Sequence, residues 1–148
     1  MLDLPPRFPY LTATMAYWLL KTEPTEYSYT DLEREQKTRW GGVTNNLALL
    51  HIRAMARGDI AFIYHSGNEK CIVAVAEIIS NPYADPGEDD PKRSVVDVKP
   101  KSRLARSIPL AAVKARKEFS DFALVRNSRL SVMPVTETQW KLLLSMSH

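Results

Sequence analysis

Cysteine is nearly absent from this chain, which has a single one, Cys71, among 148 residues. One cysteine cannot close an internal disulfide, so the fold must be stabilised by a packed core, and we expect the reducing cytoplasm as its compartment. Cys71 lies in the apolar run CIVAVAEII and not beside a histidine or a second cysteine. We therefore predict a buried thiol rather than a disulfide or a metal ligand.

Histidine is scarce, and long apolar runs are missing. The three histidines, His51, His65 and His148, have no ligand spacing with another His, Cys or carboxylate, which argues against a zinc site. The acidic loop at 81–91 lacks the ordered ligand spacing of a Ca²⁺ loop, so we favour a solvated loop there. No apolar run is long enough to span a bilayer. We expect no metal, no cofactor and no membrane partner.

Glycine is also sparse, with five residues, yet two of them are adjacent in RWGGVTNN (39–46). Gly41 and Gly42 lack the further glycines and the lysine of a phosphate-binding loop. Burial favours a tryptophan such as Trp40, whereas a glycine loses the most conformational freedom when it is ordered. The pairing indicates a place where a ligand approaches the backbone, with plain core packing of Trp40 as an alternative of about equal weight.

Charge is modest in sum but uneven along the chain. The formal net charge is +3, and 45% hydrophobic with 25% charged residues is typical of a globular protein. Between Lys92 and Lys117, nine basic residues stand against the single acid Asp97. This clustering favours a polyanionic partner, although solvated faces explain such a stretch at least as well when it is seen in isolation. The candidates for contact with a nucleic-acid backbone are Lys99, Lys101, Arg103 and Arg106.

The chain length fits one domain. Residues 1–14 hold three prolines, show no clear period and lack the charged start and apolar core of a signal peptide. The pattern changes at Met15, so we expect residues 1–14 to be an extension, from a misassigned start codon, and the domain to cover 15–148.

Short strands and short helices alternate irregularly in that domain. We expect strands over 16–21, 59–65, 71–79, 93–100 and 128–135, and helices that begin at Ser28, at Thr44 or Asn45, and at Thr136. A further helix is expected over 107–116 and a weaker one over 119–126. In the second helix, Leu47, Leu50, Ala54 and Met55 predict the buried face, and Gly58 its end. This irregular order argues against a doubly wound parallel sheet and predicts an α+β fold, a mixed and mostly antiparallel barrel with peripheral helices.

Candidate chemistry is limited to a few side chains. His65 and Ser66 are the local candidates for a base and a nucleophile, but neighbours in a strand point to opposite faces, so we favour a polar strand end over a small hydrolase or nucleotide-processing enzyme. Asp97 is either a buried polar anchor or an exposed carboxylate. The remaining function is binding, because bases stack on aromatic faces and a flipped base fits beside small polar residues. The aromatic candidates are Trp18, Trp40, Tyr17, Tyr29 and Tyr64, whereas core packing is the better prediction for Trp140, Phe62 and Phe119.

Four separated segments resemble, in order and spacing, the EVE domain proteins. They are YWLLKTEP (17–24), RWGGV (39–43), FIYHSG (62–67) and SRLSVMPV (128–135). The resemblance covers 15 to about 146 and implies a PUA-like fold, similar to YTH domains that read N6-methyladenosine. It also implies recognition of a modified base, with modified cytosine in DNA the best-supported ligand, and no catalysis. General RNA binding or an adaptor role is the alternative, and we expect a monomer that binds modified DNA or RNA.

The resemblance also assigns roles to residues. Trp40 would supply an aromatic wall, small residues and backbone amides would read the base edge, and Lys21 with Arg129 would hold phosphate. The full set of implied ligand-binding residues is Lys21, Thr22, Trp40, Val43, Asn45, His65, Ser66, Ser128, Arg129, Leu130 and Ser131. Two departures matter: Gly41 stands where the family usually has Asp or Asn, and the following segment lacks two arginines and a glutamine. The ligand can therefore differ from that of better-known relatives.

Overall fold

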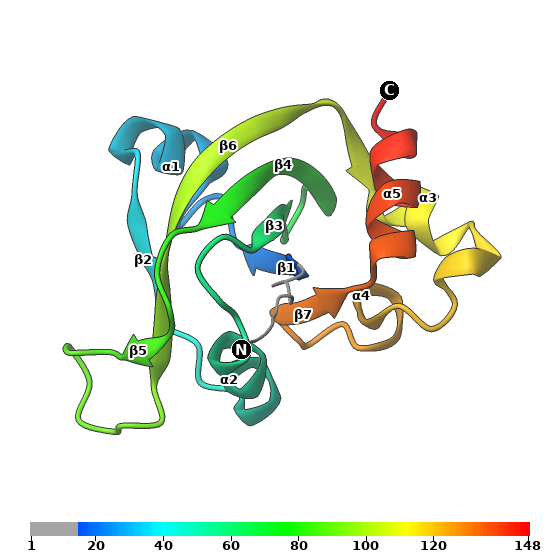
Figure 1. Ribbon diagram of the computed structural model, residues 1–148. Coiled ribbons are helices and arrows are strands. Elements are labelled where there is room, and N and C mark those ends of the chain that lie inside the picture. Colours follow the sequence, from blue (N-terminus) through cyan, green and yellow to red (C-terminus); the bar gives the residue numbers. More distant parts are fainter. Residues whose placement is uncertain (1–14) are drawn as a thin grey trace, which may run out of the picture.

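The computed structural model describes residues 15–148, so the expected extension at 1–14 lies outside the described residues (Figure 1). One mixed sheet holds the strands β1 (Tyr17–Thr22), β2 (Thr38–Trp40), β3 (Ile60–His65), β4 (Cys71–Ile78), β5 (Tyr83–Ala84), β6 (Ser94–Pro109) and β7 (Val132–Val135). Their order is β2-β6-β4-β3-β1-β7, with β5 on β6. The helices are α1 (Tyr29–Glu35), α2 (Asn46–Arg53), α3 (Leu110–Lys114), the 3-10 turn η1 (Lys117–Phe119), α4 (Ala123–Arg126) and α5 (Glu137–Met146).

The sheet curls into a half-barrel, which confirms the predicted α+β class (Figure 1). Only β1 and β3 pair in parallel, and the other strand pairs are antiparallel. The long strand β6 arches over β4, and its register with β4 shifts twice, as expected where bulges bend a strand. Because β2 and β7 end the sheet, an open seam is left between these two edge strands.

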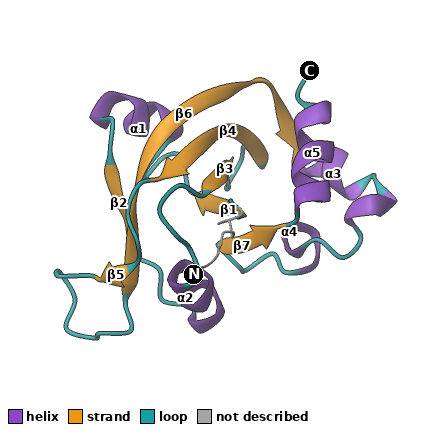
Figure 2. Cartoon of the chain, in the orientation of Figure 1, coloured by secondary structure: helices purple, strands orange, loops and turns teal. Residues whose placement is uncertain are grey.

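Aromatic side chains fill the core. Trp140 of α5 stacks on Phe62 with ring centroids 3.8 Å apart and on Tyr17 at 4.8 Å. Phe62 and Phe119 are fully buried, so core packing is confirmed for all three residues predicted to pack there. Three candidate stacking faces are also core residues, each at most 5% exposed: Trp18, Tyr29 and Tyr64. Figure 2 shows α3, α4 and α5 gathered on one side of the half-barrel and α1 on the opposite side, beside β2.

Helix α2 differs from its prediction. Leu47 and Leu50, expected in the core, are 43% and 55% exposed, whereas Ala48, Leu49 and Ile52 are buried. The helix ends at Arg53 and not at Gly58, so Ala54 and Met55 of the predicted apolar face lie beyond its last turn. Its buried stripe is therefore rotated by about one residue from the predicted one.

Two further predictions need correction, one on the length of β6 and one on the burial of Cys71. Strand β6 continues to Pro109, so the segment 101–109 is strand and the helix expected over 107–116 shrinks to α3. Cys71, predicted to be buried, is half-buried at the start of β4, and burial raises the pKa of its thiol. Pro134 lies in the edge strand β7, as its missing N–H predicted.

A buried carboxylate that the sequence analysis missed ties β1 to the turn before β3. Asp59 is 5% exposed and accepts hydrogen bonds from Trp18 Nε1 at 2.9 Å and from the backbone N–H of Ala16 and Ala56 at 3.1 and 2.9 Å. Three donors satisfy the buried acceptor and fix the start of β1. In the part of the chain that the structure describes, no helix combines the length and the hydrophobicity needed to cross a membrane.

Candidate functional site

A cavity of about 440 Å³ opens at the seam of the half-barrel. One wall is the edge strand β2 with the loop 41–45, and the other is the end of β1 with the segment just before β7. The volume is typical of small-molecule sites. Seven of the residues implied by the resemblance line it: Lys21, Thr22, Trp40, Val43, Asn45, Arg129 and Ser131. Residues that are more than 80 positions apart in the sequence thus meet around one cavity.

Trp40 forms part of this lining while it is also anchored in the core. It is 8% exposed, and its ring meets the edge of the Tyr27 ring at a centroid distance of 6.3 Å and an interplanar angle of 85°. The Tyr27 hydroxyl donates to Glu35 Oε1 at 2.7 Å, and burial together with Glu35 raises the pKa of Tyr27 to about 12. Tyr27 is therefore neutral at physiological pH, and the two rings make a rigid aromatic corner of the cavity.

The double glycine has a local structural reason. Gly42 has φ +75°, a left-handed conformation that other residues rarely adopt. A Cβ on Gly41 would lie 3.2 Å from Val95 Cγ1 and 3.3 Å from Asp85 Oδ2, so a larger residue there would require these side chains to shift. The loop then enters α2, where the Asn45 side chain accepts from the N–H of Ala48 at 3.0 Å. Asn45 is therefore the N-cap of α2, and its side-chain N–H groups remain available to a ligand.

Lys21 lines the cavity and joins the first motif to the last. Its Nζ donates to the carbonyl of Ser128 at 3.1 Å and lies 5.6 Å from the centroid of the Tyr64 ring, and its backbone N–H donates to Ser131 O at 2.9 Å. The side chain is half-buried, and this burial lowers the pKa of Lys21 because desolvation disfavours the charged form. Ser128 itself lies outside the lining, and Leu130 is buried in the core.

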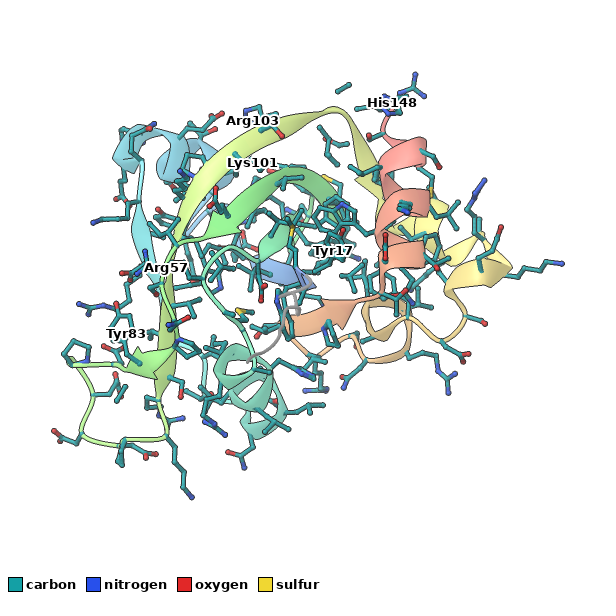
Figure 3. All side chains as sticks on the ribbon, in the orientation of Figure 1. Tyr17, Arg57, Tyr83, Lys101, Arg103 and His148 are labelled. Atoms are coloured by element: carbon teal, nitrogen blue, oxygen red, sulfur yellow. The ribbon has the colours of Figure 1, made fainter. Side chains whose placement is uncertain are left out.

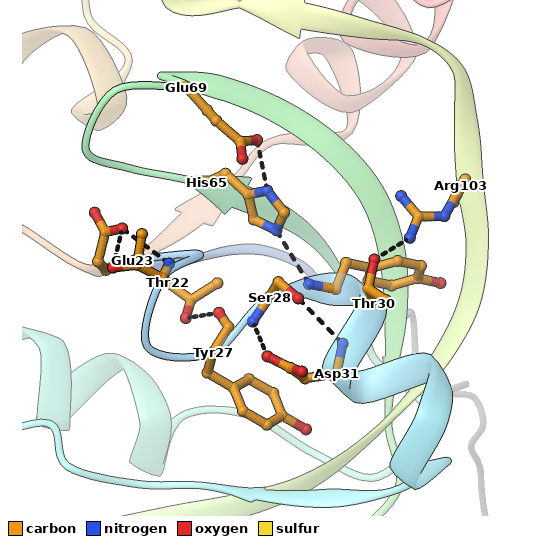
Figure 4. A network of polar contacts seen from close by, with 11 residues as sticks. Thr22, Glu23, Tyr27, Ser28, Thr30, Asp31, His65, Glu69 and Arg103 are labelled. Atoms are coloured by element: carbon orange, nitrogen blue, oxygen red, sulfur yellow. Dashed lines mark hydrogen bonds and ion pairs between the residues drawn. The ribbon is translucent and has the colours of Figure 1, made fainter.

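His65 and Ser66 also lie outside the lining of this cavity, and His65 belongs to a polar network beside it (Figure 4). His65 is 6% exposed; its Nε2 accepts from the backbone N–H of Tyr29 at 3.1 Å, and its Nδ1 lies 2.8 Å from Glu69 Oε1. This pairing assigns the ring proton to Nδ1, which donates to Glu69. Both ring nitrogens are engaged, so neither is free to take a proton from Ser66.

The capping box at the start of α1 belongs to the same network. The Ser28 hydroxyl accepts from the N–H of Asp31 at 3.1 Å, and the Asp31 carboxylate accepts from the N–H of Ser28 at 2.8 Å, as predicted (Figure 4). Thr22, although it lines the cavity, donates its hydroxyl proton to the carbonyl of Tyr27 at 2.6 Å. The network therefore holds the 22–31 segment in place and serves the fold rather than contact with a ligand.

None of the four basic residues predicted on β6 lines the cavity. Lys101 and Arg103 are exposed residues of β6 (Figure 3). Arg103 pairs with Glu33 at 2.7 Å, and Lys99 Nζ lies 3.7 Å from Glu77 Oε1. These partners reduce the positive charge that the cluster offers to a polyanion, and Arg106 is exposed on the same strand.

Three charged lining residues were missed by the sequence analysis. Arg39 lines the cavity, and its Nη1 donates to Asp85 Oδ1 at 3.3 Å. Its neighbour across the strand, Asp97, is half-buried and accepts from the Tyr83 hydroxyl at 2.6 Å, so it is the partly exposed alternative and not a buried anchor. Glu23 and Glu26 add carboxylates to the lining. The sequence indicated a role for Arg39 only through its position next to Trp40.

Metal binding finds no support in the described geometry. Between Met15 and His148, no three side chains of the His, Cys, Asp or Glu type are grouped so as to hold a metal ion. The cavity instead combines an aromatic corner, a half-buried ammonium, two arginines and two carboxylates. Such a lining suits a flat polar ligand that carries both hydrogen-bond donors and acceptors.

The chain resembles several known proteins over nearly its whole length. It is 32% identical to human thymocyte nuclear protein 1, with 90% of this chain and 74% of that protein aligned. An NMR structure from Rhodopseudomonas palustris shares 45% identity at a TM-score of 0.85, covering 90% of this chain and 93% of that one. The human THYN1 protein, solved in complex with DNA that contains 5-methylcytosine, shares 31% identity at a TM-score of 0.83, covering 90% and 98%.

These likenesses agree with the four motifs and with the half-barrel, which is the predicted PUA-like fold. The EVE domain family profile matches residues 16–146, and the chain belongs to the EVE domain family.

Proposed function

We propose that this chain is a non-catalytic nucleic-acid-binding module that holds a flipped, modified base in the seam cavity, with methylated cytosine in DNA as the first candidate. The observation that carries the proposal is the lining, in which the aromatic corner of Trp40 and Tyr27 stands beside the half-buried Lys21. The human relative solved with 5-methylcytosine DNA supports the choice of base.

Each part of the lining has a role in this proposal. The Trp40 and Tyr27 rings supply apolar contact to the base, and the backbone around Gly41 and Gly42 leaves room for the base edge. Arg129 and Arg39, both exposed, contact the phosphates on either side of the flipped nucleotide. Lys101 and Arg106 extend the phosphate contact along β6.

Binding without catalysis is the simpler function for these residues. Nucleophilic catalysis needs a base within reach of the nucleophile, and the two nitrogens of His65 are engaged by Tyr29 and Glu69. His65 and Ser66 therefore remain second in rank as an active site. We further propose that the protein works in the cytoplasm, because its single cysteine, Cys71, cannot close an internal disulfide, and that it acts as a monomer.

The test is a fluorescence-anisotropy titration with two short duplexes that differ only in a central cytosine or 5-methylcytosine. The wild-type protein should prefer the methylated duplex, and Trp40→Ala should remove that preference, at a cost of about 1–3 kcal/mol of binding. Leu50→Ala, which truncates an exposed side chain outside the cavity lining, is the matched control. Equal affinity of the wild-type protein for both duplexes and for their RNA counterparts would end the proposal.

A further inference from the structure

Lys21 differs from the other cations of the cavity in its surroundings. Arg129 and Arg39 are exposed, whereas the Lys21 side chain is half-buried and turned over the ring of Tyr64. Its register partner in β3 is also Tyr64, so the pairing of two central strands fixes its position. The ammonium is therefore held against the sheet, over the β1–β3 pair.

Within residues 15–148, the ammonium of Lys21 has unused hydrogen-bonding capacity. A lysine side chain can donate three hydrogen bonds, and Nζ donates one of them, to the carbonyl of Ser128. Among residues 15–148, no carboxylate lies within 4.0 Å of Nζ. Burial already lowers the pKa of Lys21, so the charged form gains free energy from any acceptor that a ligand brings. The protein leaves that acceptor to be supplied from outside.

A phosphate group is a poor candidate for this acceptor. Glu23 and Glu26 line the same cavity, and their negative charge offsets much of the attraction that Lys21, Arg39 and Arg129 exert on an anion. A neutral acceptor, such as a ring nitrogen or carbonyl oxygen of a base, meets no repulsion from these carboxylates. The exposed arginines at the rim are better placed for phosphate, because phosphates stay on the outside when a base enters a pocket.

We propose that Lys21 is a specificity-determining residue that donates a hydrogen bond to the acceptor edge of the inserted base, rather than the phosphate contact that the family resemblance implies. This inference rests on the proposed function. It gives the cations of the site two different roles, because Lys21 reads the base whereas Arg129 and Arg39 contact the backbone.

The experiment pairs a change in the protein with a change in the base. Three duplexes carry cytosine, 5-methylcytosine or difluorotoluene at one central position; the last has the shape of a pyrimidine but almost no hydrogen-bond acceptor strength. Lys21→Met should bind the methylated duplex about tenfold more weakly than the wild-type protein does. It should bind the difluorotoluene duplex almost as well as the wild-type protein does. Lys141→Met, which removes an exposed lysine of α5 outside the cavity lining, is the matched control and should change neither.

The result that overturns the inference is an equal loss on both duplexes together with a salt slope reduced by about one, which is the behaviour of a phosphate contact. Lys21→Gln keeps an N–H donor without a charge and should recover part of the preference; recovery no better than with Lys21→Met also counts against base contact. Failure of the proposed function is distinguishable, because the wild-type protein itself would then bind the cytosine and 5-methylcytosine duplexes equally well. Thermal unfolding of each variant verifies that it is folded.

Discussion

At the end of β2 and at the end of β3 the chain leaves the sheet in the same way, through a glycine with positive φ. Gly42 has φ +75° and Gly67 has φ +71°. The first turn opens on the seam cavity, because β2 is an edge strand with no neighbour on its outer side. The second follows β3, a central strand, which ends at His65, and both ring nitrogens of His65 are hydrogen-bonded within the protein, to Tyr29 and Glu69.

The difference between these two regions teaches where binding capacity remains in a fold. The two turns both contain glycine, but a polar group that is already hydrogen-bonded inside the protein contributes little to ligand binding. The seam region keeps unused donors on Lys21 and exposed arginines, whereas the His65 region uses its donors and acceptors to hold α1 against β3. Variants in the two regions should therefore separate stability from binding.

His65→Ala should have the largest effect, and on stability rather than on affinity. The substitution leaves the buried N–H of Tyr29 without its acceptor and removes the contact to Glu69, which should lower the free energy of unfolding by about 2–3 kcal/mol. Urea unfolding measures this, and binding to the 5-methylcytosine duplex below the transition should change little. Glu69→Gln keeps a hydrogen-bond acceptor for Nδ1 and is the mild control. Loss of binding in a stable His65→Ala protein would place His65 in the site.

The two glycine turns should respond differently to the same substitution. A Cβ on Gly67 would overlap the Glu23 carboxylate, whereas none of the neighbours of Gly42 lies within 4 Å of its Cβ position. Both changes force an alanine into the left-handed region, at about 1–2 kcal/mol. Gly67→Ala should therefore destabilise the protein more than Gly42→Ala by thermal denaturation, because it also displaces Glu23 from its hydrogen bonds with Thr25. Equal losses would mean that Glu23 moves aside freely.

Asn45→Ala tests whether the cavity wall depends on the start of α2. The side chain caps the helix through the N–H of Ala48, so its loss should cost about 1 kcal/mol of stability. Asn45→Asp keeps the capping oxygen and should retain stability, while its negative charge in the cavity lining should weaken DNA binding. Chemical denaturation and anisotropy on both variants separate the cap from the ligand contact. Identical behaviour of the two variants in both assays would contradict this division.

Much of this fold was predictable because its signals are local. Capping boxes at Ser28 and Thr136, the 59–79 hairpin and the edge position of Pro134 each depend on residues close together in sequence. The rotation of α2 and the length of β6 were not predictable in this way. They depend on which strands the segments pack against, and bulges let β6 continue where the alternation of its residues fails.

The candidate site was predictable only in part for the same reason. Motif residues led to seven lining positions, but nothing local distinguishes Trp40, at an edge strand, from His65, at a central one. The basic stretch on β6 looked like the main polyanion contact because the sequence does not reveal that Glu33 and Glu77 lie beside Arg103 and Lys99. The cations of the cavity are single residues, far apart in the chain, and so formed no visible cluster.

The smallest expected effect concerns Arg129, at the rim of the seam cavity. Arg129→Gln removes an exposed cation and should leave stability within experimental error, while it weakens DNA binding a few-fold and lowers the salt slope by about one. Because a phosphate contact carries no base information, the loss should be the same on the cytosine and 5-methylcytosine duplexes. Arg126→Gln, an exposed arginine outside the cavity lining that pairs with Asp121, is the matched control. A loss confined to the methylated duplex would instead make Arg129 a reader of the base, and the division of roles between rim and interior would fail.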